Sequence, residues 1–402
     1  MPKDYLVPLL RESQSKILLL ILDGLGGLPM EAGGPTSLEA ANTPMMDRMA
    51  AEGTLGQIVP IRPGITPGSG PAHLALFGYD PLTYLVGRGA LEAVGIGMQV
   101  KPGDVAARGN FCTLDANGLI SDRRAGRISS EAARPLTTML QTIEVPGVEI
   151  EVQHLKEYRF AIVMRGEGLH GEIEDTDPQR VGMAPLEPVA QDKASERAAK
   201  LLRQWIGSAQ ALLAGQPQAN GVTLRGFGTD PVLPKFQDMY GLKAACVAVY
   251  PMYKGVSQLV GMDVQRFEGE QPADEFAEVA RVWPDYDFVF CHVKKTDSMG
   301  EDGNFAGKQA IIEIVDQALQ TVLDLKPEVV IITGDHSTPA KMKYHSWHPV
   351  PLLLWAPERG LQDLQTAFGE RACALGGLGT IPATEILPLA LAHAGRLGKF
   401  GA

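Results

Sequence analysis

The sequence is poor in cysteine and has no long hydrophobic run. Its four cysteines, Cys112, Cys246, Cys291 and Cys373, lie far apart and form no Cys-x-x-Cys pair. This spacing argues against a disulfide framework or a zinc finger and favours reduced thiols. The apolar run Ile17–Leu22 is much too short for a signal peptide or a membrane span. We therefore expect a cytoplasmic protein with no membrane partner.

The chain also lacks an excess of positive charge. Its 36 Lys and Arg residues are outnumbered by 47 Asp and Glu residues, which gives a formal net charge of −11. A general nucleic-acid binder needs a basic face, so nucleic acid is not an expected partner. A small phosphorylated substrate is compatible with this charge, because metal ions and a local arginine cluster can reverse the field inside a cleft.

No internal repeat or low-complexity tract divides the 402 residues, yet the chain is too long for one ordinary core. Over residues 15–80 and 240–402, continuous apolar strands alternate with amphipathic helices, for example a helix over 306–325. This alternation predicts a mainly parallel α/β sheet flanked by helices. The metal-binding core is expected to comprise residues 1–86 and 235–402.

Residues 87–234 are expected to form an inserted α+β domain that covers a substrate. The strand-like segments there, 108–114, 149–153 and 159–164, are shorter and more polar, and 187–213 is mostly helical in pattern. The two crossings fall near 87–89 and 231–235, which are rich in glycine or proline. We interpret these crossings as hinges.

Three strand-like apolar runs lead into ionisable residues. A buried strand end is a costly place for such groups unless a cation pairs with them. The arrangement is typical of a metal-dependent hydrolase or transferase, if the strand ends meet at one sheet edge. The residues are Asp23 after 17–22, Asp297 shortly after 288–293, and Asp335 with His336 after 329–333.

Two short motifs each allow two interpretations. The Asp-Gly-Leu-Gly-Gly stretch from Asp23 is a tight turn or part of a ligand site, and the G-x-G-x-x-G spacing of a dinucleotide fingerprint is absent. The Gly/Pro-rich turn 66–73 presents Ser69. A serine beside a divalent cation is a competent nucleophile. Alternatively, Ser69 caps a helix that begins near Pro71.

Three of the eight histidines, His336, His345 and His348, lie within thirteen positions of one another beside Asp335. A lone histidine near a strand end is usually structural, but three beside a carboxylate favour a metal. Imidazole nitrogens together with carboxylate oxygens suit manganese, zinc, cobalt or magnesium better than calcium.

In combination these motifs resemble the archaeal-type 2,3-bisphosphoglycerate-independent phosphoglycerate mutases of the alkaline phosphatase superfamily. The resemblance runs through nearly the whole chain, and the joint order of the motifs is specific. The segments that carry it are Leu22-Asp23-Gly24, Pro67-Gly68-Ser69, Ala72-His73-Leu74, Phe77-Gly78-Tyr79-Asp80-Pro81, Gly87-Arg88-Gly89, Arg108-Gly109-Asn110-Phe111, Asp122-Arg123-Arg124-Ala125-Gly126-Arg127, His292-Val293-Lys294-Lys295-Thr296-Asp297 and Gly334-Asp335-His336-Ser337.

The resemblance implies an alkaline-phosphatase-like core that binds two divalent metal ions. Ser69 corresponds to the family's nucleophile. One implied metal site uses Asp23, Ser69, Asp335 and His336, and the other uses Asp297, Glu301 and His345. The family has histidine at the position of Glu301. Glutamate can ligate the same metals, so we expect the site to persist with an altered metal preference.

The resemblance also implies basic residues that face the metals. Arginine suits this role because its fork grips carboxylate and phosphate oxygens bidentately. Each arginine taken alone could equally be a solvated surface charge, and either Asp122 or Asp175 could act as the acid/base. The implied catalytic residues are Arg123, Arg124 and Lys254, and the implied substrate-binding residues are Asn110, Arg159, Arg165 and Arg225.

The implied activity is an isomerase reaction of glycolysis and gluconeogenesis. It interconverts 3-phosphoglycerate and 2-phosphoglycerate through a phosphoserine, without 2,3-bisphosphoglycerate. Two alternatives stay open. The first is a divergent enzyme of the same superfamily that processes another phosphoryl or phosphonate substrate, marked by Glu301. The second is a binding or scaffold protein with a degenerate site. The oligomeric state does not follow from the sequence.

Overall fold

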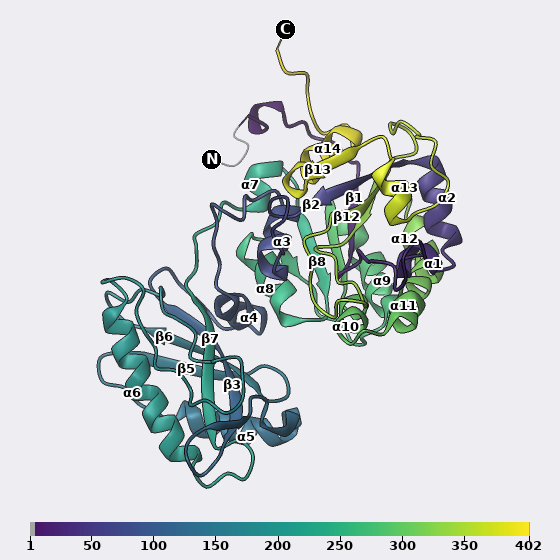
Figure 1. The fold of residues 1–402 in the computed structure, drawn as a ribbon. Coiled ribbons are helices and arrows are strands. Elements are labelled where there is room, and N and C mark those ends of the chain that lie inside the picture. The colour runs from purple at the N-terminus through teal and green to yellow at the C-terminus, as the bar shows by residue number, and fades with distance from the viewer. Residues whose placement is uncertain (1–4, 402) are drawn as a thin grey trace. The chain divides into compact units, whose positions relative to one another are not determined.

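The structure, a computed structural model, describes residues 5–401, so residues 1–4 and 402 of the predicted core lie outside the described residues. The described chain divides into two compact units (Figure 1). The first unit contains the chain up to Leu85, Pro234–Tyr253, and the chain from Val260 onward. The second unit contains Val86–Leu233 and Lys254–Leu259.

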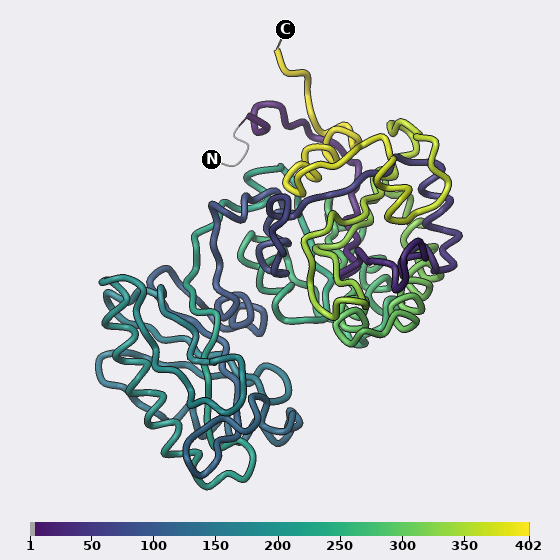
Figure 2. The backbone as a smooth tube through the Cα atoms, in the orientation of Figure 1, coloured from purple at the N-terminus to yellow at the C-terminus, as the bar shows by residue number. Residues whose placement is uncertain are grey.

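The first unit is built on an eight-stranded sheet, whose order is β13-β2-β12-β11-β1-β10-β8-β9. The backbone trace in Figure 2 shows that the purple N-terminal and yellow C-terminal parts of the chain both belong to this unit. Neighbouring strands run parallel except at β12, which is antiparallel to both β11 and β2. The mainly parallel α/β core is therefore confirmed. The strands are β1 (Ile17–Leu22), β2 (Thr54–Val59), β8 (Ala244–Ala248), β9 (Asp263–Val264), β10 (Phe288–Val293), β11 (Val329–Thr333), β12 (Val350–Trp355) and β13 (Gly379–Pro382).

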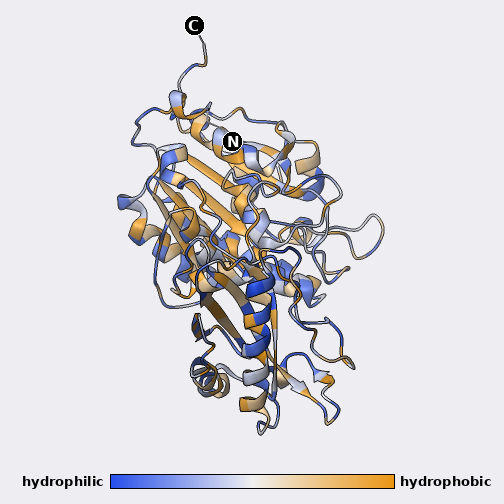
Figure 3. Cartoon of the chain, turned by 90° about the vertical axis from the view of Figure 1, so that its left-hand side faces the viewer, coloured by the Kyte–Doolittle hydropathy of each residue, from blue (hydrophilic) through white to orange (hydrophobic). Residues whose placement is uncertain are grey.

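The central strands β1, β10 and β11 are buried at every residue. Successive strand residues point to opposite faces, so both faces of the sheet are covered, as a continuous apolar run requires. Figure 3, coloured by hydropathy, shows orange, hydrophobic strands inside this unit. The helices of this unit are α1 (Ser37–Ala40), α2 (Pro44–Glu52), α3 (Ser69–Leu76), α7 (Phe236–Tyr240), α9 (Pro272–Val282), α10 (Lys295–Glu301), α11 (Phe305–Ala318), α12 (Gln320–Leu323), α13 (Glu370–Ala374) and α14 (Ile386–His393).

The second unit is an α+β structure around a five-stranded antiparallel sheet. Strands β4, β3, β6 and β5 follow one another in that order, and β7 also pairs with β3. Its core contains the buried rings of Phe111, Phe160 and Trp205. The strands are β3 (Val105–Leu114), β4 (Ile120–Asp122), β5 (Glu149–His154), β6 (Arg159–Arg165) and β7 (Gly221–Gly228), and the helices are α4 (Arg88–Gly95), α5 (Ser130–Gln141) and α6 (Glu196–Leu213).

Helix α8 (Pro251–Leu259) contains the boundary between the units, which falls after Tyr253. Short 3-10 turns complete the fold at Val7–Leu9, Ala125–Arg127, Trp283–Asp285 and Ala383–Glu385. Within residues 5–401, none of the helices has the length and apolarity that a membrane span requires.

Three helix boundaries differ from the sequence prediction. The predicted helix 306–325 is divided at Leu319 into α11 and α12. The helix predicted over 187–213 begins only at Glu196. A helix through 188 is disfavoured because Pro188 cannot donate a backbone hydrogen bond. Helix α3 begins at Ser69 rather than near Pro71, because a proline in the first turn loses no helical hydrogen bond.

Candidate metal centre

The predicted ligands meet because three parallel strands end at one sheet edge. The register pairs Leu22 with Val293 across β1 and β10, and Ile21 with Thr333 across β1 and β11. The residues that follow these strands are therefore neighbours in space. The structure thus brings together the three polar strand ends that the sequence indicated.

Two ligand clusters form at this edge. Asp23, Asp335 and His336 make one cluster, and Asp297, His336 and His345 make the other, with the ligand atoms of each within 4.8 Å of one another. The His336 Nε2 atom lies 3.4 Å from Asp23 Oδ1 and 3.1 Å from Asp335 Oδ2. His345 Nε2 lies 3.6 Å from Asp297 Oδ1. His336 is thus shared between the clusters.

Ser69 stands beside these clusters at the first residue of α3. Its Oγ lies 3.1 Å from His336 Nε2. The capping interpretation is wrong, because Gly68 is the N-cap and no side-chain cap bond forms. His73, one turn later, shares a 2.7 Å hydrogen bond with the Ser69 carbonyl and lies 3.5 Å from Asp335. The helix thereby holds the hydroxyl against the metal-ligand cluster.

Lys294, to which the sequence assigned no role, joins the two clusters. Its Nζ lies 3.0 Å from Asp23 Oδ2 and 2.5 Å from Asp297 Oδ2. Burial lowers the pKa of Lys294, but Asp23, Tyr253 and Asp297 outweigh burial and hold that pKa well above its ordinary value. The Tyr253 hydroxyl also donates a hydrogen bond to Asp23. The carboxylates therefore have an internal counter-cation.

The donor atoms of this site are chemically suited to divalent metal ions. The buried oxygens Asp23 Oδ1 and Asp335 Oδ2 have no hydrogen-bond partner among the described residues. The His336 Nε2 atom approaches both oxygens but carries at most one hydrogen. A buried carboxylate oxygen without a hydrogen bond is costly, and a cation would satisfy it. Imidazole and carboxylate ligands suit manganese, zinc, cobalt and magnesium. The two clusters can therefore hold two such ions.

Glu301 and His348 lie outside both clusters. Glu301 Oε1 is 3.9 Å from His345 Nε2, and its side chain is 55% exposed. His348 Nδ1 lies 2.9 Å from Ser346 Oγ, and its ring stacks on Trp347. Glu301 is thus close enough to approach an ion held by His345, and its role as a ligand stays a prediction.

In the second unit, basic residues share one face of the sheet. Arg108 pairs with Arg225 across β3 and β7, and Asn110 pairs with Arg159 across β3 and β6. Directly opposed residues point to the same face, and so do residues two apart on one strand. Burial lowers the pKa of Arg108, and neighbouring arginines lower it further, although Glu92, 3.4 Å away, acts in the opposite direction. This face therefore concentrates positive charge.

Asn110 adds an unsatisfied polar group to this face. It is buried, and its Oδ1 atom has no hydrogen-bond partner among the described residues. Arg123 is held differently, by a bidentate pair with Asp177 at 3.0 and 2.7 Å. Arg225 lies 3.2 Å from Asp175. These arginines are thus fixed in orientation by carboxylates of their own unit.

The other predicted substrate residues differ in their exposure and in their ion pairs. Arg165 makes ion pairs with Asp104, Glu149 and Glu151, so three carboxylates of its own unit offset its charge. Arg124 is exposed, and Lys254 lies in the part of α8 that belongs to the second unit. Arg165 consequently has the least structural support as a substrate ligand.

The two acid/base candidates are both hydrogen-bond acceptors. Asp122 accepts from the backbone N–H groups of Arg124 and Gly126 at 2.8 Å each. Asp175 accepts from the backbone N–H of Gly226 at 2.7 Å as well as from Arg225. The geometry within the unit leaves the choice between Asp122 and Asp175 open.

Comparison with known proteins decides the family. The family model described as 2,3-bisphosphoglycerate-independent phosphoglycerate mutase matches residues 50–219. A protein of Thermus thermophilus named probable 2,3-bisphosphoglycerate-independent phosphoglycerate mutase is 50% identical to this chain, over 99% of this chain and 100% of the relative. A protein of the same name from Aquifex aeolicus is 48% identical, with the same coverage. The chain belongs to this family. It is therefore a member of a family of isomerases, as the motifs predicted.

Solved structures agree with this family membership. The PH0037 protein from Pyrococcus horikoshii is 34% identical, with a TM-score of 0.83 over 96% of this chain and 99% of that chain. The cofactor-independent phosphoglycerate mutase from Thermoplasma acidophilum is 28% identical, with a TM-score of 0.70 over 95% of this chain and 100% of that chain. The fold is thus shared over nearly the full length.

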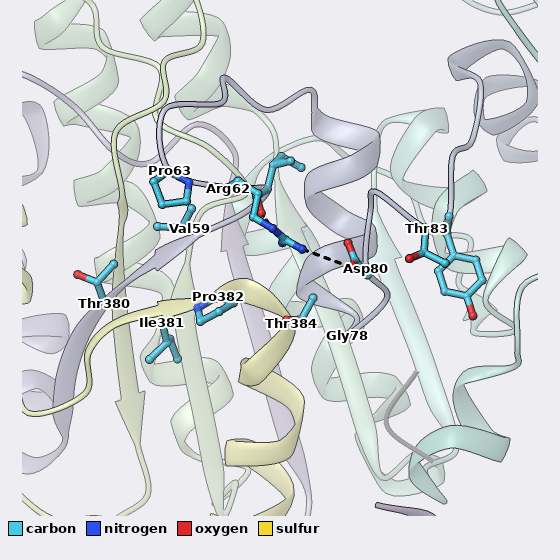
Figure 4. A pocket seen from close by; sticks show the side chains of 12 residues that line it. Val59, Arg62, Pro63, Gly78, Asp80, Thr83, Thr380, Ile381, Pro382 and Thr384 are labelled. Carbon is cyan, nitrogen blue, oxygen red and sulfur yellow. Dashed lines mark hydrogen bonds and ion pairs between the residues drawn. The ribbon is translucent and has the colours of Figure 1, made fainter. Parts of the chain in front are cut away.

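The core unit of this phosphoglycerate mutase family member also contains a cavity of about 550 Å³ that shares no residue with the metal clusters (Figure 4). Arg62 and Asp80 lie at its wall as an exposed ion pair at 3.5 Å. The charges of Arg62 and Asp80 thus offset each other. The lining residues are Val59, Ile61, Arg62, Pro63, Gly78, Asp80, Thr83, Tyr84, Thr380, Ile381, Pro382 and Thr384.

Proposed function

We propose that the chain interconverts 3-phosphoglycerate and 2-phosphoglycerate in the cytoplasm, as a step of glycolysis and gluconeogenesis. The observation that carries the proposal is the position of Ser69 Oγ, 3.1 Å from the shared ligand His336, in a member of this family. The proposed route passes through a phosphoserine at Ser69 and needs no 2,3-bisphosphoglycerate.

Two divalent ions would be held at the core site. Asp23, Ser69, Asp335 and His336 are proposed to bind one ion, and Asp297, Glu301 and His345 to bind the other. Bound ions would lower the cost of deprotonating the serine and offset charge on the phosphoryl oxygens. Manganese, magnesium, zinc and cobalt all suit this donor set.

The chemical steps belong to Ser69 and the glycerate hydroxyls. Ser69 loses its proton to solvent, and its Oγ attacks phosphorus in line. The Ser–O–P bond forms as the bond from phosphorus to the substrate oxygen breaks, and that oxygen takes up a proton. Glycerate then presents its other hydroxyl, which loses a proton and attacks phosphorus; the Ser–O–P bond breaks as the new bond forms, and the serine oxygen takes up a proton again. Asp122 or Asp175 is proposed to carry the proton of the glycerate hydroxyl.

The second unit is proposed to hold the glycerate and to exclude water. A phosphoserine that met water would be hydrolysed, and the enzyme would then act as a phosphatase. A forked guanidinium can grip the carboxylate or phosphate oxygens of the substrate. The proposed contacts are Asn110, Arg123, Arg124, Arg159, Arg165, Arg225 and Lys254.

A coupled assay tests the proposal directly. Purified protein is stripped of metal, reloaded from a panel of manganese, magnesium, zinc and cobalt, and given 3-phosphoglycerate with enolase as the reporter. Formation of 2-phosphoglycerate that depends on the added ion supports the mutase. Release of inorganic phosphate with no enolase signal would instead favour the divergent phosphoryl- or phosphonate-processing enzyme. A protein that binds no ion at any loading would favour a scaffold.

A further inference from the structure

Lys308 is a fully buried lysine on α11, and its ammonium contacts the loops that carry the predicted metal ligands. Its Nζ donates hydrogen bonds to the carbonyls of Gly24, Gly26 and Thr338, at 2.6, 2.9 and 3.0 Å. An ammonium group has three hydrogens to donate. All three are accounted for by backbone oxygens, so the group is placed as a small cation would be placed.

The three carbonyls belong to the two loops that carry metal ligands. Gly24 and Gly26 follow Asp23, and Thr338 follows Asp335 and His336. The loops also bond to each other, because Thr338 N–H donates to the Gly26 carbonyl at 3.0 Å. Gly24 N–H donates to Asp335 Oδ1 at 3.0 Å. Any shift between these loops would therefore move the ligands of one cluster relative to one another.

Thr338 extends the connection to the second cluster. Its Oγ1 donates to Asp297 Oδ1 at 2.7 Å and lies 2.9 Å from His336 Nδ1. The same residue thus fixes a carboxylate of one cluster and the imidazole that both clusters share. Its carbonyl, in turn, is held by Lys308.

We propose that Lys308 is a positioning residue whose ammonium replaces a structural monovalent cation, gathering the loops after β1 and β11 so that Asp23 and His336 keep the spacing of metal ligands. A side chain needed only to fill space on this helix could be apolar, as Ile312 and Val315 on the buried stripe are. The other polar residue of the stripe, Asp316, likewise has defined partners, because it accepts hydrogen bonds from two backbone N–H groups. A buried ammonium is costly unless it is fully hydrogen-bonded, and here the two loops supply every acceptor.

The inference rests on the proposed metal site, and Mn²⁺ binding to the unmodified chain tests that site separately. The full-length protein is compared with Lys308→Met and with Lys326→Met, a control at an exposed lysine. Mn²⁺ dissociation constants are measured by calorimetry, and folding is checked by circular dichroism and thermal melting. Because residues that orient metal ligands typically contribute 10–100-fold to affinity, we expect Lys308→Met to weaken Mn²⁺ binding by about 10-fold or more.

Chemical rescue separates positioning from simple space filling. Lys308→Ala is refolded with propylammonium, which can replace the missing chain and its N–H donors, or with tetramethylammonium, which has no N–H donor. We expect propylammonium alone to restore Mn²⁺ affinity toward that of the unmodified chain.

Three outcomes would overturn the inference. In the first, a folded Lys308→Met variant binds Mn²⁺ as tightly as the unmodified chain does. In the second, tetramethylammonium rescues Lys308→Ala as well as propylammonium does. In the third, propylammonium fails to rescue at all. A finding that even the unmodified chain binds no Mn²⁺ would instead overturn the metal site itself, together with everything built on it.

Discussion

Lys294 shows how one side chain can serve two clusters at the residue scale. Its ammonium lies within 3.0 Å of a carboxylate from each, at Asp23 and Asp297. These carboxylates come from segments far apart in sequence and would repel each other without a cation. In metal-free protein the lysine is therefore expected to be the main charge that stabilises the site.

We predict that Lys294→Met destabilises the metal-free protein by on the order of 2 kcal/mol, which is less than for a fully buried pair because the lysine side chain is 27% exposed. Melting in a chelator, compared with melting in excess Mn²⁺, measures the effect. The deficit should shrink with Mn²⁺, because the ion replaces the lost charge. An equal deficit in both conditions would contradict this account, and Lys399→Met provides a surface control.

Ser69→Ala should remove phosphoryl transfer without unfolding the protein, because the helix that begins at Ser69 uses no side-chain cap. We expect the mutase rate to fall by more than about 1,000-fold, as for the loss of a covalent nucleophile. The coupled assay and a search for phosphoserine by mass spectrometry measure this. A rate near that of the unmodified enzyme would rule out Ser69 as the nucleophile.

Glu301→His tests the residue that departs from the family pattern. Glu301 lies 3.9 Å from His345, so an imidazole at this position could join the same ion. We expect binding of zinc and cobalt to strengthen relative to magnesium, because nitrogen ligands favour the former. Calorimetric titration with each metal measures the change. Identical metal preferences in both forms would show that position 301 is not a ligand.

At the scale of elements, α9 contains a buried acid that the function does not use. Glu275 is 2% exposed, and its Oε2 has no hydrogen-bond partner among the described residues. Burial raises the pKa of Glu275 to about 8, although Lys295 acts in the opposite direction. The folded chain therefore holds this proton at pH values where the unfolded chain releases it.

This difference makes stability depend on pH. The folded state binds the extra proton between the unfolded pKa of 4.5 and the folded pKa of about 8, so stability should fall as pH rises through that window. Glu275→Gln removes the charge. We expect the difference in the free energy of unfolding between the variant and the unmodified chain to shift in favour of the variant by on the order of 3 kcal/mol from pH 5 to pH 8. Urea unfolding at both values measures the gain, and a pH-independent difference would contradict the prediction.

At the scale of the whole molecule, the proposed cap must close over the substrate. The glycines first interpreted as a hinge are packed within the second unit. A Cβ on Gly87 would lie 2.2 Å from the Phe227 carbonyl oxygen, and one on Gly89 would lie 2.3 Å from Ala107 Cα. Substitution there would disturb packing as well as hinge motion, so closure needs a test that leaves the linkers unchanged.

We predict that Mn²⁺ and 3-phosphoglycerate together reduce the radius of gyration of the Ser69→Ala variant, because that variant binds substrate without turning it over. Small-angle scattering measures the change, and Mn²⁺ without substrate is the control. Closure requires the substrate to contact both units, so each component alone should leave the radius unchanged. A radius that stays constant at saturating substrate would contradict the cap.

Local patterns in the sequence determined the strands and the ligands at their ends. An apolar run followed at once by a charged residue is visible within a few positions, and β1, β10 and β11 were predicted in this way. Asp23, Asp335 and His336 were predicted for the same reason, whereas His345 was predicted from the clustering of histidines beside Asp335 and from the family resemblance. These side chains lie close together because parallel strands place their carboxyl ends at one sheet edge, and their role as metal ligands stays a prediction.

Only the tertiary structure decided which distant groups meet. The antiparallel direction of β12, the link made by Lys294 between two clusters, and the three carbonyls around Lys308 depend on strand order and helix placement. A signal for Lys308 existed, since this lysine shares the buried stripe of α11 with Ile312 and Val315. Its partners could not be read from the chain, because a hydrogen bond to a backbone carbonyl leaves no mark on the residue types that supply it.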